Sequence, residues 1–314
     1  HSTVFQEYAS AVVDDLVERY DLRGLDVVEI GAGQGDFLEM LCAAGGNRGW
    51  GFDPSFVDAA ERPGDVRLVA DFYDERYADH PADVIICRHV LEHIDRSGDF
   101  VAMVRRVIGT RPARLVVFEV PDAAWTLRRG GIWDIIYEHC GYFAEASLRQ
   151  VFARSGFRIE RVDTVFGGQF IVLEATPAET PTELPSDHAA AVAALRDDVA
   201  AFAAAHAADV DRWRSWFEAL ARDGRSAVVW GAGSKGVTFL NTVDRSRVTD
   251  RAVDINPRKW GMHVAGTGQR IIAPDELVAD PADAVVVMNP NYRDEIASTL
   301  SALGLHPEVV VATT

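Results

Sequence analysis

The stretch Glu29-Ile30-Gly31-Ala32-Gly33-Gln34-Gly35 decides the fold of this chain of 314 residues. It ends an apolar run at residues 26–30, which predicts a buried strand, and residues 36–44 after it have the pattern of a helix. A strand, a glycine loop and a helix in this order begin an open, mainly parallel α/β sheet. Ligands bind such sheets at the carboxyl ends of the strands, where glycines let the backbone approach them closely.

The spacing of these glycines favours S-adenosylmethionine (SAM) over a dinucleotide as the ligand. The loop has the form E-x-G-x-G-x-G, whereas the dinucleotide pattern G-x-G-x-x-G would need a glycine where Asp36 stands. Glu29 is expected near the cationic end of SAM, and Asp53, which ends the next strand, is expected to accept hydrogen bonds from the ribose hydroxyls. Asp71 with Phe72 is a candidate adenine contact. The alternative is a glycine turn that only permits close packing of the helix. The predicted cofactor-binding residues are Glu29, Gly31, Gly33, Gly35, Asp53, Pro54, Asp71, Phe72, Arg88 and His89.

Strands and helices alternate along the rest of the chain, in two unequal halves. Further strands are predicted at residues 49–52, 66–69, 82–87, 114–120, 157–164, 169–175, 226–230, 251–254, 284–288 and 308–312, and further helices at 4–20, 98–108 and 148–155 and from the second glycine loop to 241. Residues 177–185 hold three prolines and have the composition of a linker, and an alanine-rich helix is predicted at 188–222. We therefore expect a SAM-binding domain at residues 1–180, a linker and helix at 181–223, and a smaller Rossmann-like domain at 224–314.

The composition restricts the possible partners and the location of the protein. The 31 basic and 48 acidic residues give a formal net charge of −17, which should repel nucleic acid and anionic membrane surfaces. Cys42, Cys87 and Cys140 lie far apart, so neither a disulfide framework nor a structural zinc site is expected. Residues 4–20 are too charged for a signal peptide, and no apolar run of about 18 residues could span a membrane. We expect a cytoplasmic monomer or homodimer that acts on a small molecule.

The second glycine loop, Gly231-Ala232-Gly233-Ser234-Lys235-Gly236, supports a rival function. It has the G-x-G-x-x-G spacing, and Asp254 ends the next strand 18 residues beyond Gly236. This pattern is typical of dinucleotide binding and would suit a nicotinamide-dependent oxidoreductase. However, the domain would have only about 90 residues, half of the usual two-part sheet. Lys235 and Arg293 could offer charge to a phosphate, and solvated surface positions are the alternative for both.

The segment Arg88-His89-Val90-Leu91-Glu92-His93 contains H-x-x-E-H, a pattern found in zinc proteases. On a helix, His89 and His93 would share a face and could bind a metal. Here the segment directly follows a predicted strand, and the sequence offers no evident third ligand. We therefore predict no metal, and we expect these side chains to face the cofactor or the substrate, with a histidine bonded to backbone as the alternative.

A cluster of titratable side chains follows the strand predicted at 114–120. Tyr137-Glu138-His139-Cys140-Gly141-Tyr142-Phe143 should lie over the carboxyl edge of the sheet, where a substrate would enter. A histidine beside a glutamate is a base that can be tuned near neutral pH. The alternative is a cap helix whose polar groups satisfy one another.

With these motifs, the sequence resembles the sugar C-methyltransferases of deoxysugar biosynthesis, which act on nucleotide-linked 4-keto-6-deoxysugars. The resemblance covers nearly the whole chain. It rests on residues 28–35, RHVLEHI at 88–94, EVPD at 119–122, Glu138-His139 with Tyr142-Phe143, Gly167-Gly168, WGAGSKGVTFLN at 230–241, VDINP at 253–257, Gly266-Thr267-Gly268 and NYRDEI at 291–296. That family usually begins with a cysteine-rich zinc-binding domain, which this sequence lacks, and it reads Y-H-E-H where this chain has Tyr137-Glu138-His139.

The resemblance implies a class I methyltransferase sheet, a helical linker and a smaller Rossmann-like domain that is associated with the substrate. It implies SAM-dependent methylation of a carbon atom through an enolate, with His139 as the base and Glu138 orienting it. His93, Tyr137 and Tyr142 are candidates to bind the acceptor or to stabilise the enolate. O-methylation of a hydroxyl or carboxylate is the alternative. A non-catalytic SAM-binding protein or scaffold would leave the Glu138-His139 cluster without a task.

Overall fold

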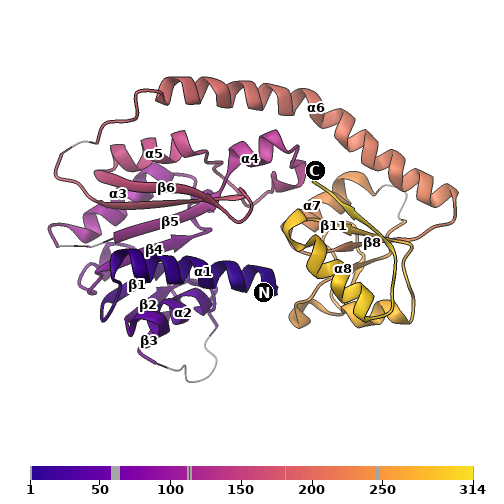
Figure 1. Ribbon diagram of the computed structural model, residues 1–314, viewed down its shortest axis with the longest axis horizontal. Helices are drawn as coiled ribbons and strands as arrows, with labels where there is room; N and C mark the ends of the chain where they lie inside the picture. The colour runs from indigo at the N-terminus through magenta and orange to yellow at the C-terminus, as the bar shows by residue number, and fades with distance from the viewer. Residues whose placement is uncertain are drawn as a thin grey trace. The chain divides into compact units, whose positions relative to one another are not determined.

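The computed structural model describes residues 2–57, 64–111, 113, 115–180, 182–244 and 248–313. The chain forms two compact units (Figure 1). The larger unit comprises residues 7–124 and 138–195, and the smaller unit comprises residues 1–6, 125–137 and 196–314. The domain boundaries expected from the sequence stay a prediction. They did not foresee that residues 125–137 leave the larger unit and pack with the smaller one.

The larger unit is built on a sheet with the strand order β3-β2-β1-β4-β5-β7-β6. Its strands are β1 (Asp26–Ile30), β2 (Arg48–Phe52), β3 (Val66–Val69), β4 (Val84–Arg88), β5 (Leu115–Pro121), β6 (Phe157–Val165) and β7 (Phe170–Pro177). All neighbouring strands are parallel except β7, which is antiparallel to both β5 and β6. The strand order reverses between β1 and β4, and a crevice for a ligand forms at such a point, beyond the carboxyl ends of the strands.

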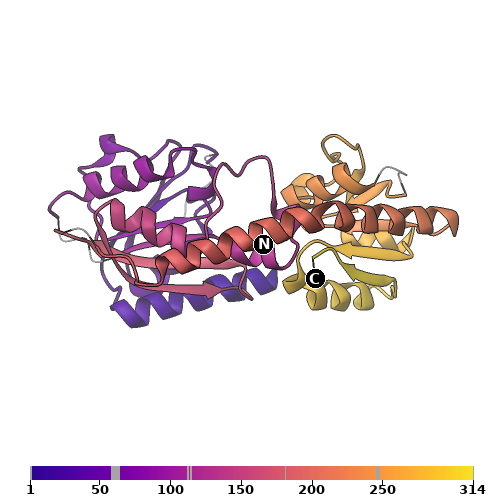
Figure 2. The same ribbon diagram turned by 90° about the horizontal axis from the view of Figure 1, so that it is seen from above.

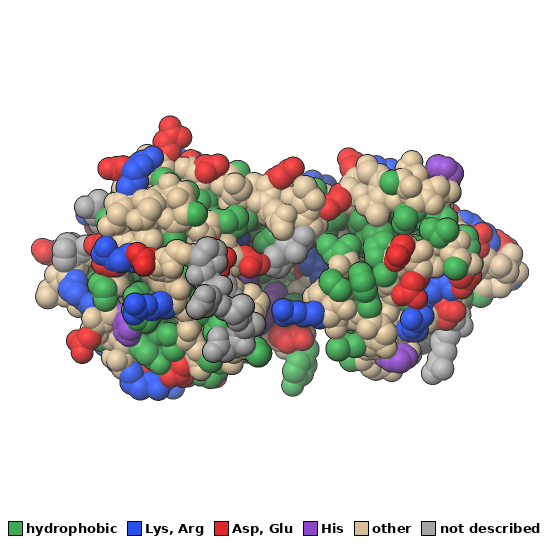
Figure 3. Space-filling view, turned by 90° about the horizontal axis from the view of Figure 1, so that it is seen from below, with side chains coloured by type: hydrophobic (Ala, Val, Ile, Leu, Met, Phe, Trp, Pro, Cys, Tyr) green, Lys and Arg blue, Asp and Glu red, His purple; other side chains and the backbone are tan. Residues whose placement is uncertain are grey.

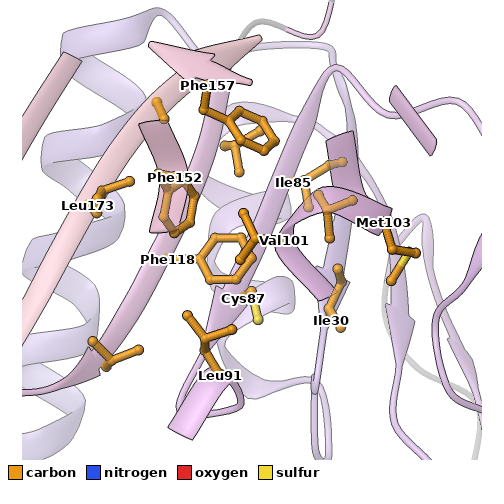
Figure 4. Close-up of a cluster of buried hydrophobic side chains, with 14 of the residues drawn as sticks. Ile30, Ile85, Cys87, Leu91, Val101, Met103, Phe118, Phe152, Phe157 and Leu173 are labelled. Atoms are coloured by element: carbon orange, nitrogen blue, oxygen red, sulfur yellow. The ribbon is translucent and has the colours of Figure 1, made fainter. Parts of the chain in front are cut away.

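Helices cover both faces of this sheet because each of them has one apolar side. The helices of the larger unit are α1 (Thr3–Tyr20), α2 (Asp36–Gly45), α3 (Ser97–Ile108) and α5 (Glu145–Arg154). Buried side chains of α1 and α2 pack in one core, and those of α3 and α5 pack in another. Figure 4 shows the second core, where the rings of Phe118 and Phe152 meet edge to face with their centroids 4.9 Å apart. The two cores hold the carboxyl ends of the strands in place.

The smaller unit has a five-stranded sheet of order β10-β9-β8-β11-β12, with all strands parallel. Its strands are β8 (Ala227–Trp230), β9 (Arg251–Val253), β10 (Arg270–Ile272), β11 (Ala284–Val287) and β12 (Glu308–Val311), and its helices are α4 (Ala123–Arg128), α7 (Ser234–Val243) and α8 (Arg293–Ala302). The long helix α6 (His188–Arg222), seen in Figure 2, buries Trp213 and Phe217 against Phe239 of α7. Trp133 enters the same core, with its ring 4.6 Å from that of Phe239, and its indole N–H donates to the carbonyl of Ala312. These contacts place residues 125–137 in the smaller unit.

The fold class expected from the sequence is confirmed, but several elements differ. Short 3-10 helices lie at Glu75–Tyr77, Leu91–His93, Ile132–Asp134, Pro257–Lys259, Pro274–Val278 and Pro290–Tyr292. The sequence did not predict α4, α8 or β10, and β10 has only three residues, too few for a visible alternation. Helix α5 begins at Glu145, three residues before the predicted start. The prediction of a strand from Arg114 begins on a residue outside the described ones.

The surface carries both signs of charge, although the net charge is strongly negative. On the face shown in Figure 3, basic and acidic side chains lie among hydrophobic ones. Within the described part of the chain, no helix combines the length and the apolar character that crossing a membrane would need. Even α6, with 35 residues, carries charged side chains along its length.

Candidate active site

The glycine loop after β1 is tied to both neighbouring strands. The backbone N–H groups of Gly31 and Ala32 donate to the carbonyl of Phe52 at 2.8 and 3.2 Å. Gly31 has a φ of +73°, and a Cβ there would lie 2.1 Å from Cγ2 of Val90, in the loop after β4. Only glycine fits this backbone and this contact. The close approach joins the loop after β1 to the loop after β4, at the point where the strand order reverses.

Asp53 directly follows β2, at the strand end where the sequence predicts a carboxylate that binds the ribose hydroxyls. Its Oδ2 accepts a hydrogen bond from the backbone N–H of Gly33 at 2.8 Å, so it joins the end of β2 to the glycine loop. Its Oδ1 accepts from both the backbone N–H and the hydroxyl of Ser55, in the turn that Pro54 begins. A carboxylate has about four acceptor positions, so Asp53 can accept a further donor while it holds the loop.

Glu29 is buried beneath the loop, with a side chain that is only 3% exposed. One of its carboxylate oxygens has no hydrogen-bond partner in the structure. Burial raises the pKa of Glu29 to about 8, although Arg88 opposes the shift. A cationic ligand near this carboxyl would favour its ionised form. This environment suits the predicted position near the cationic end of SAM.

Asp71 and Phe72 follow β3 and have different surroundings. Asp71 accepts a hydrogen bond from the hydroxyl of Tyr77 at 2.7 Å and forms an ion pair with Arg76 at 3.0 Å. These two neighbours hold the pKa of Asp71 below its usual value. The ring of Phe72 is 67% exposed and is available to a flat ligand. The adenine contact therefore stays a prediction that Phe72 supports better than Asp71.

Arg88 and His89, assigned to the cofactor from the sequence, lie against Glu119 at the end of β5. Arg88 donates two hydrogen bonds of 3.0 Å to the Glu119 carboxylate, and Nε2 of His89 lies 2.7 Å from it. The hydroxyl of Tyr8, on α1, donates to the same carboxylate at 2.8 Å. Burial alone would raise the pKa of Glu119, but Arg88 and His89 hold it at about 2. In return, Glu119 raises the pKa of His89 to about 9 against the effect of burial.

Sequence reasoning missed the central role of Glu119 and the part played by Tyr8. Glu119 belongs to the motif EVPD at residues 119–122, but nothing in the neighbouring sequence indicates that it is buried and paired with both Arg88 and His89. Tyr8 is 111 positions away from Glu119 in the sequence, so no pattern within a helix or a strand connects them. His89 also has a φ of +54°, an uncommon backbone for a residue other than glycine. Such strain is often found at functional sites.

The structure brings together several of the predicted catalytic residues. Nδ1 of His93 donates to the backbone carbonyl of Glu138 at 2.9 Å, and the rings of His93 and His139 lie 4.9 Å apart. The ring of Tyr142 lies 5.9 Å from that of His139. The side chain of Glu138 is exposed, and it is the backbone of this residue that contacts His93. Tyr137 is fully exposed and is grouped with the smaller unit.

Glu92, which sequence reasoning left out of the site, anchors the segment that carries His139. Its backbone carbonyl accepts hydrogen bonds from the N–H groups of Cys140 and Gly141 at 2.7 and 3.0 Å. The 3-10 helix Leu91–His93 therefore fixes the position of the loop in space. His93, three residues after the Val90 contact with the glycine loop, lies against the segment that carries His139, with its ring 4.9 Å from that of His139. The structure therefore brings the imidazoles of His93 and His139 and the ring of Tyr142 together beyond the carboxyl end of β4.

The second glycine loop has the glycine spacing of a dinucleotide site, but the carboxylate beside it is already paired with a cation. A Cβ on Gly236 would lie 2.0 Å from the carbonyl oxygen of Gly231, so glycine there serves close packing. Oδ2 of Asp254 accepts from the N–H of Ala232 at 3.0 Å and also pairs with Nζ of Lys259 at 2.8 Å. The same lysine donates to the carbonyl of Ala232. The charge of the Asp254 carboxylate is therefore already neutralised by a cation. A carboxylate that accepts the ribose hydroxyls of a dinucleotide would not be expected to have such a partner.

Comparison with known proteins adds two family models and several solved structures. The model described as "Methyltransferase domain" matches residues 5–162, half of the chain, and the model described as "C-methyltransferase C-terminal domain" matches residues 179–306. No curated protein matches the sequence.

Among solved structures, magnesium protoporphyrin IX methyltransferase from Synechocystis, with bound S-adenosylhomocysteine, is 20% identical, with a TM-score of 0.40 over 56% of this chain and 84% of that chain. The 1,6-didemethyltoxoflavin-N1-methyltransferase of Burkholderia thailandensis is 17% identical, with a TM-score of 0.41 over 56% of this chain and 82% of that chain.

Proposed function

This chain belongs to the methyltransferase family, with the C-terminal domain of the C-methyltransferases, and on that premise we propose that it transfers the methyl group of SAM to a carbon atom next to a ketone in a small-molecule acceptor. The observation that carries the choice of carbon is the placement of His139 beside His93, with their rings 4.9 Å apart, in a loop anchored to the end of β4. A hydrogen atom on carbon needs a base before the carbon can attack, and this pair offers one.

The proposed reaction has two steps. A ring nitrogen of His139 takes the proton from the carbon next to the ketone, and the electron pair of the C–H bond forms an enolate. The enolate oxygen needs hydrogen-bond donors, for which His93, Tyr137 and Tyr142 are the candidates. The enolate carbon then attacks the methyl carbon of SAM, and the S–C bond breaks with its electrons staying on sulfur, giving S-adenosylhomocysteine. Most of the remaining task is alignment and exclusion of water.

Residues of the larger unit would hold the cofactor. Asp53 would accept the ribose hydroxyls with the acceptor capacity left beside its bonds to Gly33 and Ser55. Glu29 would gain a cationic neighbour for its unpartnered carboxylate oxygen. Arg88 and His89 would act through Glu119, since both lie against that carboxylate.

The substrate class we propose is a nucleotide-linked 4-keto-6-deoxysugar. Its ketone makes the neighbouring proton acidic, as the enolate route requires. The sequence motifs EVPD at 119–122 and WGAGSKGVTFLN at 230–241 support this class through the resemblance described above. The pairing of Asp254 with Lys259 argues against the oxidoreductase alternative, because the carboxylate that would accept the ribose hydroxyls of a dinucleotide is neutralised.

The proposed function is tested with SAM that carries a ¹³C-labelled methyl group and a nucleoside-diphosphate 4-keto-6-deoxyhexose. We expect a product one methyl group heavier, with the label bonded to carbon in its NMR spectrum. A label on oxygen would show instead that the protein is an O-methyltransferase. No methylated product from this class of ketone would reject the substrate.

The His139→Asn variant tests the base directly. We expect turnover to fall by about 10² or more, because general-base catalysis contributes that much, while SAM affinity is unchanged. In D₂O, the wild type with S-adenosylhomocysteine in place of SAM should still exchange the α-proton of the ketone, and the variant should not. The matched control is His206→Asn, which removes an exposed histidine on α6. Normal turnover in His139→Asn would remove this residue from the base role.

A further inference from the structure

Three side chains at the carboxyl end of β4 form a group whose chemistry goes beyond proton abstraction. Glu92, His93 and His139 each offer a ligand atom, and these three atoms lie within 4.8 Å of one another. Glu92 and His93 come from the 3-10 helix after β4, and His139 comes from a loop 46 positions further along the chain. We propose that these residues form a binding site for a divalent transition-metal ion of the Zn²⁺ type.

The carboxylate of Glu92 gives the first reason. Its side chain is 2% exposed, and its Oε2 is buried without a hydrogen-bond partner. Its Oε1 lies 3.6 Å from Nδ1 of His89, which is too long for a hydrogen bond. A buried carboxylate oxygen without a partner is costly, and native structures usually satisfy such an atom. A cation bound between Glu92 and the two imidazoles would satisfy it.

The tautomer of His93 gives the second reason. Because Nδ1 faces the carbonyl oxygen of Glu138 at 2.9 Å, it must carry the hydrogen and donate it. In the neutral ring, the lone pair is then on Nε2. Histidines that bind metals usually have this arrangement, with the other ring nitrogen donating to a carbonyl or a carboxylate. The ring of His93 is also exposed, so an ion can reach it from solvent.

The anchoring of the loop gives the third reason. The backbone carbonyl of Glu92 accepts from the N–H groups of Cys140 and Gly141, directly after His139. One residue therefore supplies a side-chain ligand and also fixes the segment that supplies the third ligand. The H-x-x-E-H pattern had pointed to His89 as the partner of His93, but His89 lies against Glu119 at 2.7 Å. The third ligand that the sequence did not reveal is His139.

The ligand set selects the kind of ion. Two imidazoles and one carboxylate hold zinc in catalytic sites, where a fourth position stays open. Mg²⁺ and Ca²⁺ prefer sites made of oxygen ligands. Zinc bonds of about 2.1 Å place tetrahedral ligand atoms ~3.4 Å apart. Since the three atoms now lie within 4.8 Å of one another, each group would have to move about 1 Å or less toward the ion. Rotation of the exposed His93 ring and a small shift of His139 would allow this.

An ion at this site would compete with the proposed reaction. It would occupy a lone pair of His139 and prevent that nitrogen from taking a proton. This consequence rests on the proposed function, whereas the binding of the ion does not. We therefore expect Zn²⁺ to bind whether or not the acceptor is a ketone, and to inhibit methyl transfer if His139 is the base.

Equilibrium dialysis of the chelator-treated full chain with Zn²⁺, and titration with Co²⁺ followed by visible absorption, test the site. We expect one Zn²⁺ or one Co²⁺ ion to bind per chain. Excess Zn²⁺ should displace the bound Co²⁺, whereas excess Mg²⁺ should not. Glu92→Gln, His93→Gln and His139→Asn should each weaken binding at least tenfold. His206→Asn on α6 is the control and should bind as the wild type does.

Two results would overturn the site: less than one ion per chain in the wild type, or equal affinity in all four variants. Binding of SAM to each variant, measured by calorimetry, confirms that the variant is folded. If Glu92→Gln does not fold, His139→Asn decides, because that side chain is only partly buried. Stoichiometric Zn²⁺ binding to a chain whose metal-free form transfers no methyl group would support the site and reject the proposed function.

Discussion

At the scale of single residues, a carboxylate at the end of the second strand has a different environment in each sheet. Asp53 and Asp254 both accept a hydrogen bond from a backbone N–H of the neighbouring glycine loop. Asp254 is also paired with Lys259, whereas Asp53 accepts a side-chain hydrogen bond from the neutral hydroxyl of Ser55. Two loops that look related in sequence therefore differ in the charge they present to a ligand.

This difference predicts the effect of two matched substitutions on SAM binding. Asp53→Asn should weaken SAM affinity about tenfold, because hydrogen bonds to a charged acceptor are worth roughly 1.5–3 kcal/mol each and one acceptor oxygen is lost. Asp254→Asn makes the same chemical change in the other loop and should leave SAM affinity unaltered. Isothermal titration calorimetry measures both. Equal effects of the two variants would contradict the assignment of SAM to the first loop.

His89 predicts a dependence of stability on pH. Its pKa is raised to about 9 by Glu119, above the unfolded value near 6.5. A group whose pKa is higher in the folded state stabilises it fully below the unfolded pKa, and this contribution is lost as the pH rises through the folded pKa. The free energy of unfolding should therefore fall between about pH 6.5 and 9.

His89→Asn is the substitution that isolates this effect. Asparagine tolerates a positive φ better than most residues, so the backbone at +54° can be kept while the titrating ring is removed. Urea unfolding at pH 6.5 and at pH 9.5 should show a smaller difference in the variant than in the wild type. An unchanged difference would mean that the ion pair with Glu119 does not contribute to stability.

At the scale of elements, most of the regular structure could be predicted, because it depends on patterns within short windows. The bounds of β1, β3 and α6 agree with the sequence, where apolar runs or a long alanine-rich stretch end at clear turn residues. The pairing of Tyr8 with Glu119 and of Glu92 with the His139 loop could not be predicted. Those contacts depend on how elements that are distant in the sequence pack against one another. The periodicity of a short stretch of sequence does not indicate such packing.

The contact between the loops after β1 and β4 predicts that a second substitution will restore the stability lost in a first one. Gly31 and Gly33 both have a positive φ, but only a Cβ on Gly31 would meet a neighbour, at 2.1 Å from Val90. Gly33→Ala should cost about 1–2 kcal/mol of stability for the left-handed backbone alone. Gly31→Ala should cost more, and Val90→Ala added to it should recover the excess. Urea unfolding of the single and double variants measures this, and no recovery would disprove the contact.

At the scale of the whole molecule, the hydrophobic side chains form separate cores. The clusters around Phe118 and Leu38 contain residues of the larger unit, and those around Phe239 and Val285 contain residues of the smaller unit. The tryptophans are distributed unequally between the two units. Of the seven, Trp50 lies in the larger unit and the other six lie in the smaller unit.

This distribution predicts how SAM changes unfolding. A ligand at 100 times its Kd stabilises the folded state that binds it by about 2.7 kcal/mol. We expect SAM to slow hydrogen exchange in β1, β2 and β4 and to leave the tryptophan-fluorescence transition in urea nearly unchanged. The measurement compares both signals with and without SAM, using Trp50→Phe to remove the one tryptophan of the larger unit. Equal shifts in both signals would show that the two units unfold together.

The segment at residues 125–137 has a consequence for the protein while it is being synthesised. Trp133 leaves the ribosome 106 residues before Phe239, the ring against which it packs. At about 5–20 residues per second, the nascent chain carries this apolar segment without its partner for roughly 5–20 s. The larger unit is complete at residue 195, well before that partner exists. Early translation therefore yields a folded unit with an unmatched hydrophobic segment, which is the kind of surface that chaperones bind.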